Sequence, residues 1–129
     1  MRYSCQIKDE YDVQDLLHSL LKLDFNDIRT EEWTPSYAGA ASRIHLVLKD
    51  QKIVIETKKI SKALKTKEKG KQLIEDIAKY KEYPRVDTLI CFIYDPDSII
   101  TNPDGFKSDL EKLSKPNFKV TVIISPNLI

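Results

Sequence analysis

The sequence lacks the features that mark membrane, secreted and repeat proteins. Its 129 residues include only two cysteines, too few for a disulfide framework. No apolar run approaches the roughly 20 residues that a membrane-spanning helix needs, and the first ten residues contain no hydrophobic signal-peptide core. Internal repeats and low-complexity segments are also absent. These absences predict a cytoplasmic protein that does not contact a membrane.

The composition predicts one globular domain. Hydrophobic residues make up 41% of the chain and charged residues 32%, which is typical of a folded rather than a disordered protein. A chain of this length can bury roughly two-thirds of its unfolded surface, so it needs no covalent staple. No linker divides the sequence, and residues 1–129 are therefore expected to form a single domain. Cys91 lies within an apolar run and is predicted to be a reduced core residue.

The charge is unevenly distributed, although the net charge is only +1. The segment 52–71 contains eight lysines and two glutamates and carries a charge of +6, so the other residues together carry −5. A basic cluster on a nearly neutral chain is typical of a face that binds a polyanion. A solvated, lysine-rich loop explains the charge equally well, and charge alone does not separate the two interpretations.

The first third of the chain is predicted to be a helix followed by an irregular segment. Apolar residues at helical spacing predict a helix over residues 9–23, with Asp9 as its N-cap. The apolar face of this helix consists of Val13, Leu16, Leu17, Leu20 and Leu21. Residues 24–40 are expected to be irregular because Pro35 and Gly39 interrupt regular structure there.

The rest of the chain alternates between strands and helices. Residues 42–48 and 52–59 are predicted to form a hairpin, and the nearly continuous apolar run over 86–94 predicts a strand buried on both faces. Lysine-rich residues 61–70 form either a loop or the start of a helix. Helices are also expected over 71–80 and 105–113, and a final strand over 118–125. This order predicts an α/β fold: a three-layer sandwich whose central mixed sheet has four or five strands.

The hairpin is expected to bring functional side chains together. If its turn consists of residues 50–51, paired positions sum to 101, and His45 lies opposite Glu56 while Arg43 lies opposite Lys58. Side chains alternate between the faces of a strand, so Glu56 and Lys58 share a face, and His45 lies within cross-strand reach of Glu56. We therefore predict that His45, Glu56 and Lys58 converge on one exposed concave surface.

A glutamate two residues before a lysine fits the hydrolysis of a phosphodiester. A carboxylate can help to hold Mg²⁺, and the metal polarises the phosphate and activates an attacking water. The lysine stabilises the negative charge that develops in the transition state. An isolated Glu-x-Lys pair is nevertheless common, and a salt-bridged strand end explains it as well.

The similarity extends beyond this pair. The segment SRIHLVLKDQKIVIETKK (residues 42–59) resembles the catalytic hairpin of the PD-(D/E)xK nuclease superfamily, and more closely the nuclease domains of bacterial restriction and defence proteins. Four further segments resemble parts of that family. In chain order, its N-terminal helix, approach loop, post-motif helix and core strand match IKDEYDVQDLLHSLL, EEWTPSYAGAASR, GKQLIEDIAKY and DTLICFIYDPD. The resemblance covers nearly the whole chain and implies a restriction-endonuclease-like fold.

The resemblance implies roles for individual residues. Glu56 matches the metal-binding acid, Lys58 the catalytic lysine and Gln72 a position near the site. Glu10 is a weaker match to an additional metal-binding acid. His45 stands at the catalytic and metal-binding position where the family has Asp, and imidazole suits Mn²⁺ or Zn²⁺ better than Mg²⁺. The implied cofactor is Mg²⁺ or Mn²⁺.

The resemblance also implies a nucleic-acid substrate, with DNA favoured over RNA. Phosphate contacts are expected from Arg43, Lys59, Lys62, Lys65, Lys67, Lys69 and Lys71. The implied function is a metal-dependent nuclease in a prokaryotic restriction or defence context. The alternative is a degenerate nuclease fold that binds nucleic acid or a protein partner without cutting, and His45 is the residue that separates the two. A homodimer, or fusion to a larger defence protein, stays open.

Overall fold

The computed structural model describes residues 7–33, 43–61, 66–80 and 86–125. Within these residues, one five-stranded sheet has the strand order β1-β2-β3-β4-β5. Its strands are β1 (Ile28–Trp33), β2 (Arg43–Leu48), β3 (Ile53–Lys59), β4 (Thr88–Tyr94) and β5 (Lys119–Ser125). The helices packed against it are α1 (Glu10–Leu21), α2 (Thr66–Tyr80) and α3 (Pro103–Glu111). The predicted α/β fold with a mixed sheet is confirmed.

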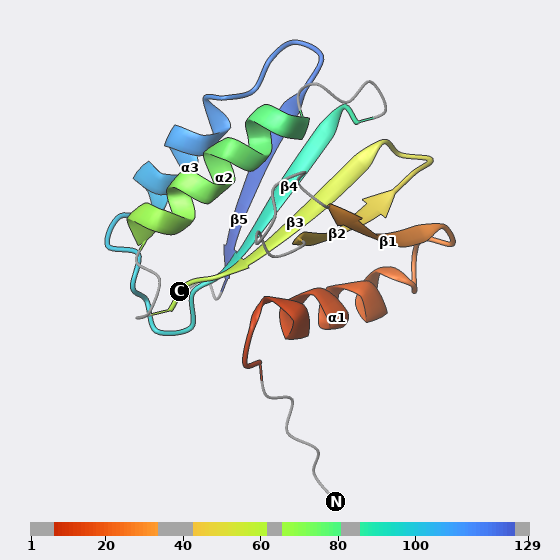
Figure 1. Cartoon of the computed structure of the whole chain (residues 1–129), viewed down its shortest axis with the longest axis horizontal. Helices are drawn as coiled ribbons and strands as arrows, with labels where there is room; N and C mark the ends of the chain where they lie inside the picture. Colours follow the sequence, from red (N-terminus) through yellow and green to blue (C-terminus); the bar gives the residue numbers. More distant parts are fainter. Residues whose placement is uncertain (1–6, 34–42, 62–65, 81–85, 126–129) are drawn as a thin grey trace, which may run out of the picture.

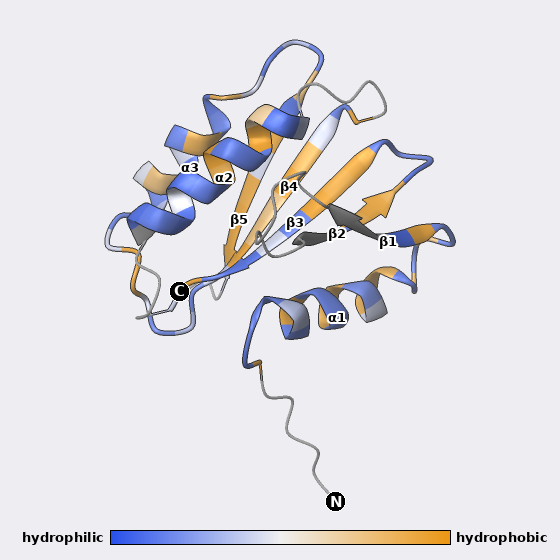
Figure 2. Cartoon of the chain, viewed as in Figure 1, coloured by the Kyte–Doolittle hydropathy of each residue, from blue (hydrophilic) through white to orange (hydrophobic). Residues whose placement is uncertain are grey.

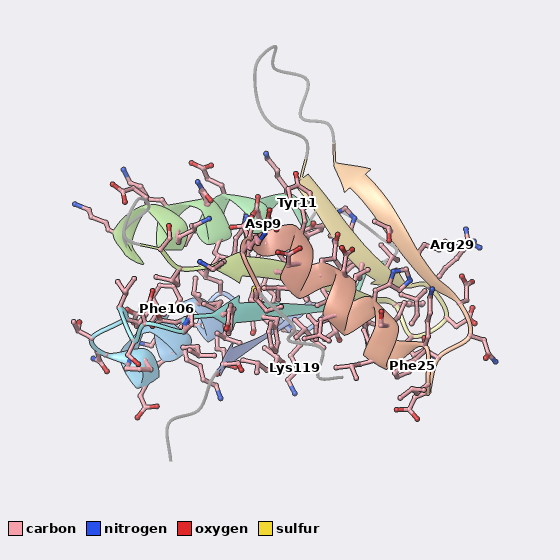
Figure 3. All side chains as sticks on the ribbon, turned by 90° about the horizontal axis from the view of Figure 1, so that it is seen from below. Asp9, Tyr11, Phe25, Arg29, Phe106 and Lys119 are labelled. Atoms are coloured by element: carbon pink, nitrogen blue, oxygen red, sulfur yellow. The ribbon has the colours of Figure 1, made fainter. Side chains whose placement is uncertain are left out.

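The helices form two layers, one on each face of the sheet (Figure 1). Helix α1 covers one face, whereas α2 and α3 lie side by side on the other. Figure 3 shows α1 crossing its face of the sheet, with Asp9 and Tyr11 near one end and Phe25 near the other. Each interface has its own apolar core: Leu46, Leu48 and Ile55 are buried on the α1 side, and a larger cluster is buried on the side of α2 and α3. A three-layer sandwich results.

The sheet combines an antiparallel and a parallel half. Strands β1, β2 and β3 form an antiparallel meander, whereas β3, β4 and β5 are parallel. Parallel neighbours need a crossover connection, and α2 and α3 provide the two crossovers. Strand β4 is paired along both edges, and its Leu89, Cys91 and Ile93 side chains are completely buried. The predicted strand is therefore confirmed over residues 88–94, but only the face that carries these three side chains is fully buried, and the residues between them are half-buried.

The predicted register of the hairpin is confirmed. Residues 46–48 pair antiparallel with residues 53–55, and each pair sums to 101. The turn is closed by a 3.2 Å hydrogen bond in which the backbone N–H of Lys52 donates to the carbonyl of Lys49. The two residues between them, 50–51, are those expected at the turn. This register fixes which side chains of β2 and β3 face α2.

The prediction of an irregular segment over residues 24–40 is wrong where β1 forms. Strand β1 pairs with β2 along its whole length, from Ile28 opposite Leu48 to Trp33 opposite Arg43. Its sequence, IRTEEW, is mainly polar and lacks the alternation that marks a half-buried strand. Edge strands tolerate such polar sequences because only one of their edges is paired and the other meets solvent.

The helices bury narrower stripes than the sequence predicts. On α2, Leu73 and Ile77 are completely buried, but Ile74, expected on the same face, is 50% exposed. On α1, Leu16 and Leu20 are likewise exposed. A helix lying on a sheet contacts it along one stripe, and residues one position away from that stripe turn outward. None of the described helices is long and apolar enough to cross a membrane.

Helix α2 offers a matched pair of substitutions that tests this packing. We expect Ile77→Ala to lower the free energy of unfolding by about 2–5 kcal/mol, because it leaves a cavity in the core. Ile74→Ala, on the exposed side of the same helix, should change it by about 0.5 kcal/mol or less. Urea denaturation monitored by circular dichroism measures both. Equal losses would show that α2 does not dock through this stripe.

Candidate active site

The carboxyl half of β3 carries charged side chains into the interior. Figure 2 shows β3 changing from hydrophobic to hydrophilic along its length. Alternation places Val54, Glu56 and Lys58 on one face, and Val54 packs in the core on the side of α2. Glu56 and Lys58 are each only 2% exposed. Burying a charged side chain is costly unless it is paired, so the groups around this pair must compensate for the lost hydration.

Lys58 lies between two buried carboxylates. Its Nζ is 3.5 Å from Oε1 of Glu56 and 3.7 Å from Oδ2 of Asp76. Glu56 comes from the same strand as Lys58, whereas Asp76 comes from α2, which lies over this face of the sheet. Asp76 is 4% exposed, so bulk water screens these interactions weakly. We call the set Glu56, Lys58 and Asp76 the buried ion cluster.

Tyr80 connects the buried ion cluster to His45. The Tyr80 hydroxyl donates a 2.9 Å hydrogen bond to Oε2 of Glu56, and its ring packs edge-on against the His45 imidazole, with ring centroids 5.4 Å apart. Burial, together with the neighbouring Glu56 carboxylate, raises the pKa of Tyr80 far above its ordinary value. The hydroxyl therefore stays protonated and continues to donate to Glu56.

The expected convergence of His45, Glu56 and Lys58 on one face is confirmed, but the expected exposure is wrong. All three side chains are buried, and His45 is 4% exposed. The physical reason is the position of α2, which lies over this face of the sheet. Its Asp76 contacts Lys58, and its Tyr80 contacts Glu56 and His45. A strand pattern shows which residues share a face, but not which element covers them.

The sequence analysis did not identify Asp76 and Tyr80 as members of the site. Asp76 lies three residues after Leu73 and four before Tyr80, so the three side chains share the buried stripe of α2. A carboxylate within an otherwise apolar helical stripe is the signal that could have revealed it. Gln72, predicted to lie near the site, is half-buried on the same helix one turn before Asp76, and its role stays a prediction.

A second group of charged residues lies at the carboxyl end of β3. Glu10, the first residue of α1, forms an ion pair with Lys69 of α2. Its Oε1 also accepts a 3.4 Å hydrogen bond from the backbone N–H of Lys59. These residues border an open pocket of about 220 Å³, lined by Lys8, Asp9, Glu10, Tyr11, Lys59, Ser61 and Lys69. The ion pair thus joins α1 and α2, which lie on opposite faces of the sheet, around the carboxyl end of β3.

The described side chains do not fit a bound divalent metal as they stand. Among them, no three His, Cys, Asp or Glu side chains gather closely enough to hold an ion. The carboxylates of Glu56 and Asp76 are suitable donors for Mg²⁺, but the ammonium of Lys58 lies next to both. Glu10, predicted to be a further metal ligand, is paired with Lys69. The metal-binding roles of Glu10, His45 and Glu56 therefore stay predictions.

The predicted phosphate contacts differ in accessibility. Lys67 and Lys71 are exposed on α2, and Lys59 is half-buried at the end of β3. Lys69 is 5% exposed and pairs with Glu10, which is incompatible with a surface contact to phosphate in this arrangement. The predicted contacts that lie outside the described residues are Lys62, Lys65 and the side chain of Arg43.

The thiol of Cys91 provides a pH-dependent test of the site's surroundings. Cys91 lies beside Glu56 in the sheet, and burial, followed by the charges of Glu56 and Asp76, raises its pKa from 9.0 to about 12. Because the folded-state pKa is the higher one, the neutral thiol stabilises the fold below pH 9.0, and this contribution is lost as the pH rises toward 12.

We therefore expect the free energy of unfolding of the wild type to fall more steeply above pH 9.0 than that of Cys91→Ala. Urea denaturation at several pH values measures both slopes. The two proteins should show the same slope near neutral pH, where the thiol is protonated in both the folded and the unfolded state. Identical slopes at alkaline pH would contradict the prediction.

Comparison with protein families extends the resemblance seen in the sequence. Residues 2–127 match the model of the family described as REase DpnII-MboI, which is a restriction endonuclease family. No curated protein matches the chain, and no solved structure does. The family match covers nearly every residue, but it does not address the histidine at position 45. The chain belongs to the DpnII-MboI restriction endonuclease family.

Proposed function

We propose that this domain cleaves the phosphodiester bonds of DNA as a nuclease of the restriction type. The observation that carries the proposal is the buried ion cluster, in a chain that matches a restriction endonuclease family over nearly its whole length. Buried ion pairs are poor stabilisers, and replacing them with well-packed apolar residues often stabilises a protein by about 1–4 kcal/mol. Charged groups at this depth are therefore better explained by chemistry than by stability.

Lys58 has the proposed central role. Its ammonium is oriented by two carboxylates in a region from which water is largely excluded, where a fixed charge stabilises a transition state far more than it would in water. The charge it would stabilise is the one that develops on the phosphate oxygens. Glu56 is fixed from both sides, by the Tyr80 hydroxyl at Oε2 and by Lys58 at Oε1. The role of Glu56 is to hold the Lys58 ammonium in the right orientation relative to the phosphate.

Two conditions follow from the geometry. Glu56 and Lys58 are 2% exposed, so a DNA phosphate can reach them only after the covering groups on the α2 side move. A divalent ion, which the family resemblance implies, would supply Lewis-acid chemistry when bound. The roles proposed for Lys58 and Glu56 rest on their own positions and charges.

A DNA-binding domain that does not cut is the second candidate. Two observations favour it: histidine stands at position 45, and the buried ion cluster is closed without a group of three metal ligands. The exposed lysines of α2 would serve either function. Cleavage assays on the same variants separate the two candidates.

Cleavage of plasmid DNA in Mg²⁺ and in Mn²⁺ tests the proposal. We expect Glu56→Ala and Lys58→Ala each to lower the rate by about 100-fold or more, since each removes a preorganised charge. His45→Asp should cut faster than the wild type in Mg²⁺, because it adds a hard oxygen ligand. The wild type should prefer Mn²⁺, which tolerates imidazole better than Mg²⁺ does.

The control for these variants is Asp15→Asn, which removes a carboxylate from the exposed side of α1, on the other face of the sheet, and should leave the rate unchanged. RNA is assayed in parallel. If neither the wild type nor His45→Asp cuts any nucleic acid with either metal, the non-cutting candidate replaces the nuclease.

DNA binding by the exposed face of α2 should depend strongly on salt. Lys67 and Lys71 are exposed one helical turn apart, and each phosphate that a lysine neutralises contributes about 0.9 to the slope of log affinity against log salt. The double substitution Lys67→Glu/Lys71→Glu should therefore weaken binding at low salt and flatten this slope by about 2. Fluorescence anisotropy with a labelled duplex measures both quantities.

The matched control is Lys112→Glu/Lys119→Glu, which makes the same charge change at two exposed positions, one at the end of α3 and one at the start of β5. We expect this variant to retain the salt slope of the wild type. A similar loss of slope in both double variants would show that binding follows net charge rather than the α2 surface.

A further inference from the structure

Asp76 occupies a position where an apolar residue would serve the core better. It is 4% exposed on the buried stripe of α2, with the completely buried Leu73 and Ile77 beside it on the same helix. A carboxylate at such a site loses its hydration, and the loss must be offset by a charged or hydrogen-bonding partner. The Nζ of Lys58, 3.7 Å from Oδ2 of Asp76, is such a partner. Lys58 is thus a charged partner that Asp76 meets at the interface between α2 and the sheet.

The two carboxylates next to Lys58 act from different directions. Glu56 lies two residues earlier on the same strand and attracts the ammonium along the sheet, with Oε1 at 3.5 Å. Asp76 attracts it from the helix that lies over the sheet. A lysine side chain has a flexible four-carbon stem, so one partner on its own strand leaves the ammonium free to swing. Partners on two elements fix it to one position.

We propose that Asp76 is a positioning residue that holds the ammonium of Lys58 in its catalytic place. This inference rests on the proposed nuclease function. Position 45 carries histidine rather than a carboxylate, and Asp76 supplies the second carboxylate beside Lys58 from another element. Tyr80 supports the arrangement by binding Oε2 of Glu56, which leaves Oε1 directed at Lys58. Asp76 acts through Lys58 and does not itself touch the substrate.

The test combines DNA cleavage with a measurement that does not need activity. The folded wild type, Asp76→Asn, Asp76→Glu and the control Asp15→Asn are treated with a trace of an amine-acylating reagent, and the labelling rate of each lysine is measured by peptide mass spectrometry. In the wild type, Lys58 and Lys69 should both react slowly, because both are buried and ion-paired. In Asp76→Asn we expect Lys58 to react about tenfold faster, because it has lost one partner. Lys69 should not change.

In the cleavage assay, Asp76→Asn should lower kcat by about 100-fold with little change in KM, the expected effect of a misplaced catalytic group. Asp76→Glu restores the charge with a longer side chain and should recover part of the loss. Asp15→Asn should match the wild type in both measurements. These results together would support a role in positioning rather than in folding.

The outcomes separate this inference from the proposed function. If the wild type does not cut DNA, the nuclease proposal fails, and the labelling of Lys58 still decides the role of Asp76. If Lys58 stays slow in Asp76→Asn, or if Lys58 and Lys69 become reactive together, the positioning role is overturned. If Asp76→Asn does not fold, Asp76→Ala, which also removes the carboxylate, decides: faster labelling of Lys58 alone supports the inference, and wild-type labelling of Lys58 overturns it.

Discussion

The ammonium of Lys58 connects two layers of the molecule. Its partners, Glu56 and Asp76, come from β3 and from the helix that covers it. An apolar interface tolerates small displacements, but a displaced partner here would leave a buried charge unpaired, which is strongly destabilising. Helix α2 must therefore dock on the sheet in one position. That position in turn places the Tyr80 hydroxyl on Glu56 and its ring against His45.

Strand β3 is apolar in its first half and charged in its second. Its first residues, Ile53, Val54 and Ile55, pack in the cores on both faces of the sheet. Its last residues meet charged groups from both helical layers: Asp76 of α2 contacts Lys58, and Glu10 of α1 contacts the backbone of Lys59. The hairpin register places His45 of β2 beside this charged half. The packed apolar half of β3 thus holds the charged half of the strand in a fixed position.

The features that the sequence predicts correctly are those set by one element or one turn. The side-chain period of a strand is two, so a turn at residues 50–51 sets one register for the hairpin, and it is the observed one. The apolar run over residues 86–94 likewise predicts β4 without reference to any other element. Strand β1 was missed because its polar sequence carries no alternation, and only pairing with β2 makes it a strand. The burial of the site depends on where a later helix docks, which no local pattern contains.

The burial that holds the charged groups of the cluster in place also separates them from anything dissolved in the surrounding water. A carboxylate at position 45, opposite Glu56 in the hairpin register, would add a third acid to a cluster that holds one ammonium, and without a divalent ion that arrangement would carry more unbalanced negative charge at low screening. Histidine at this position therefore suits a cluster that stays closed in the absence of metal. If the domain cuts DNA, the substrate phosphate must displace part of this cover, and the free energy of opening adds to the activation barrier. Its rate would then be set by how easily α2 separates from β3 as well as by the charges beneath it.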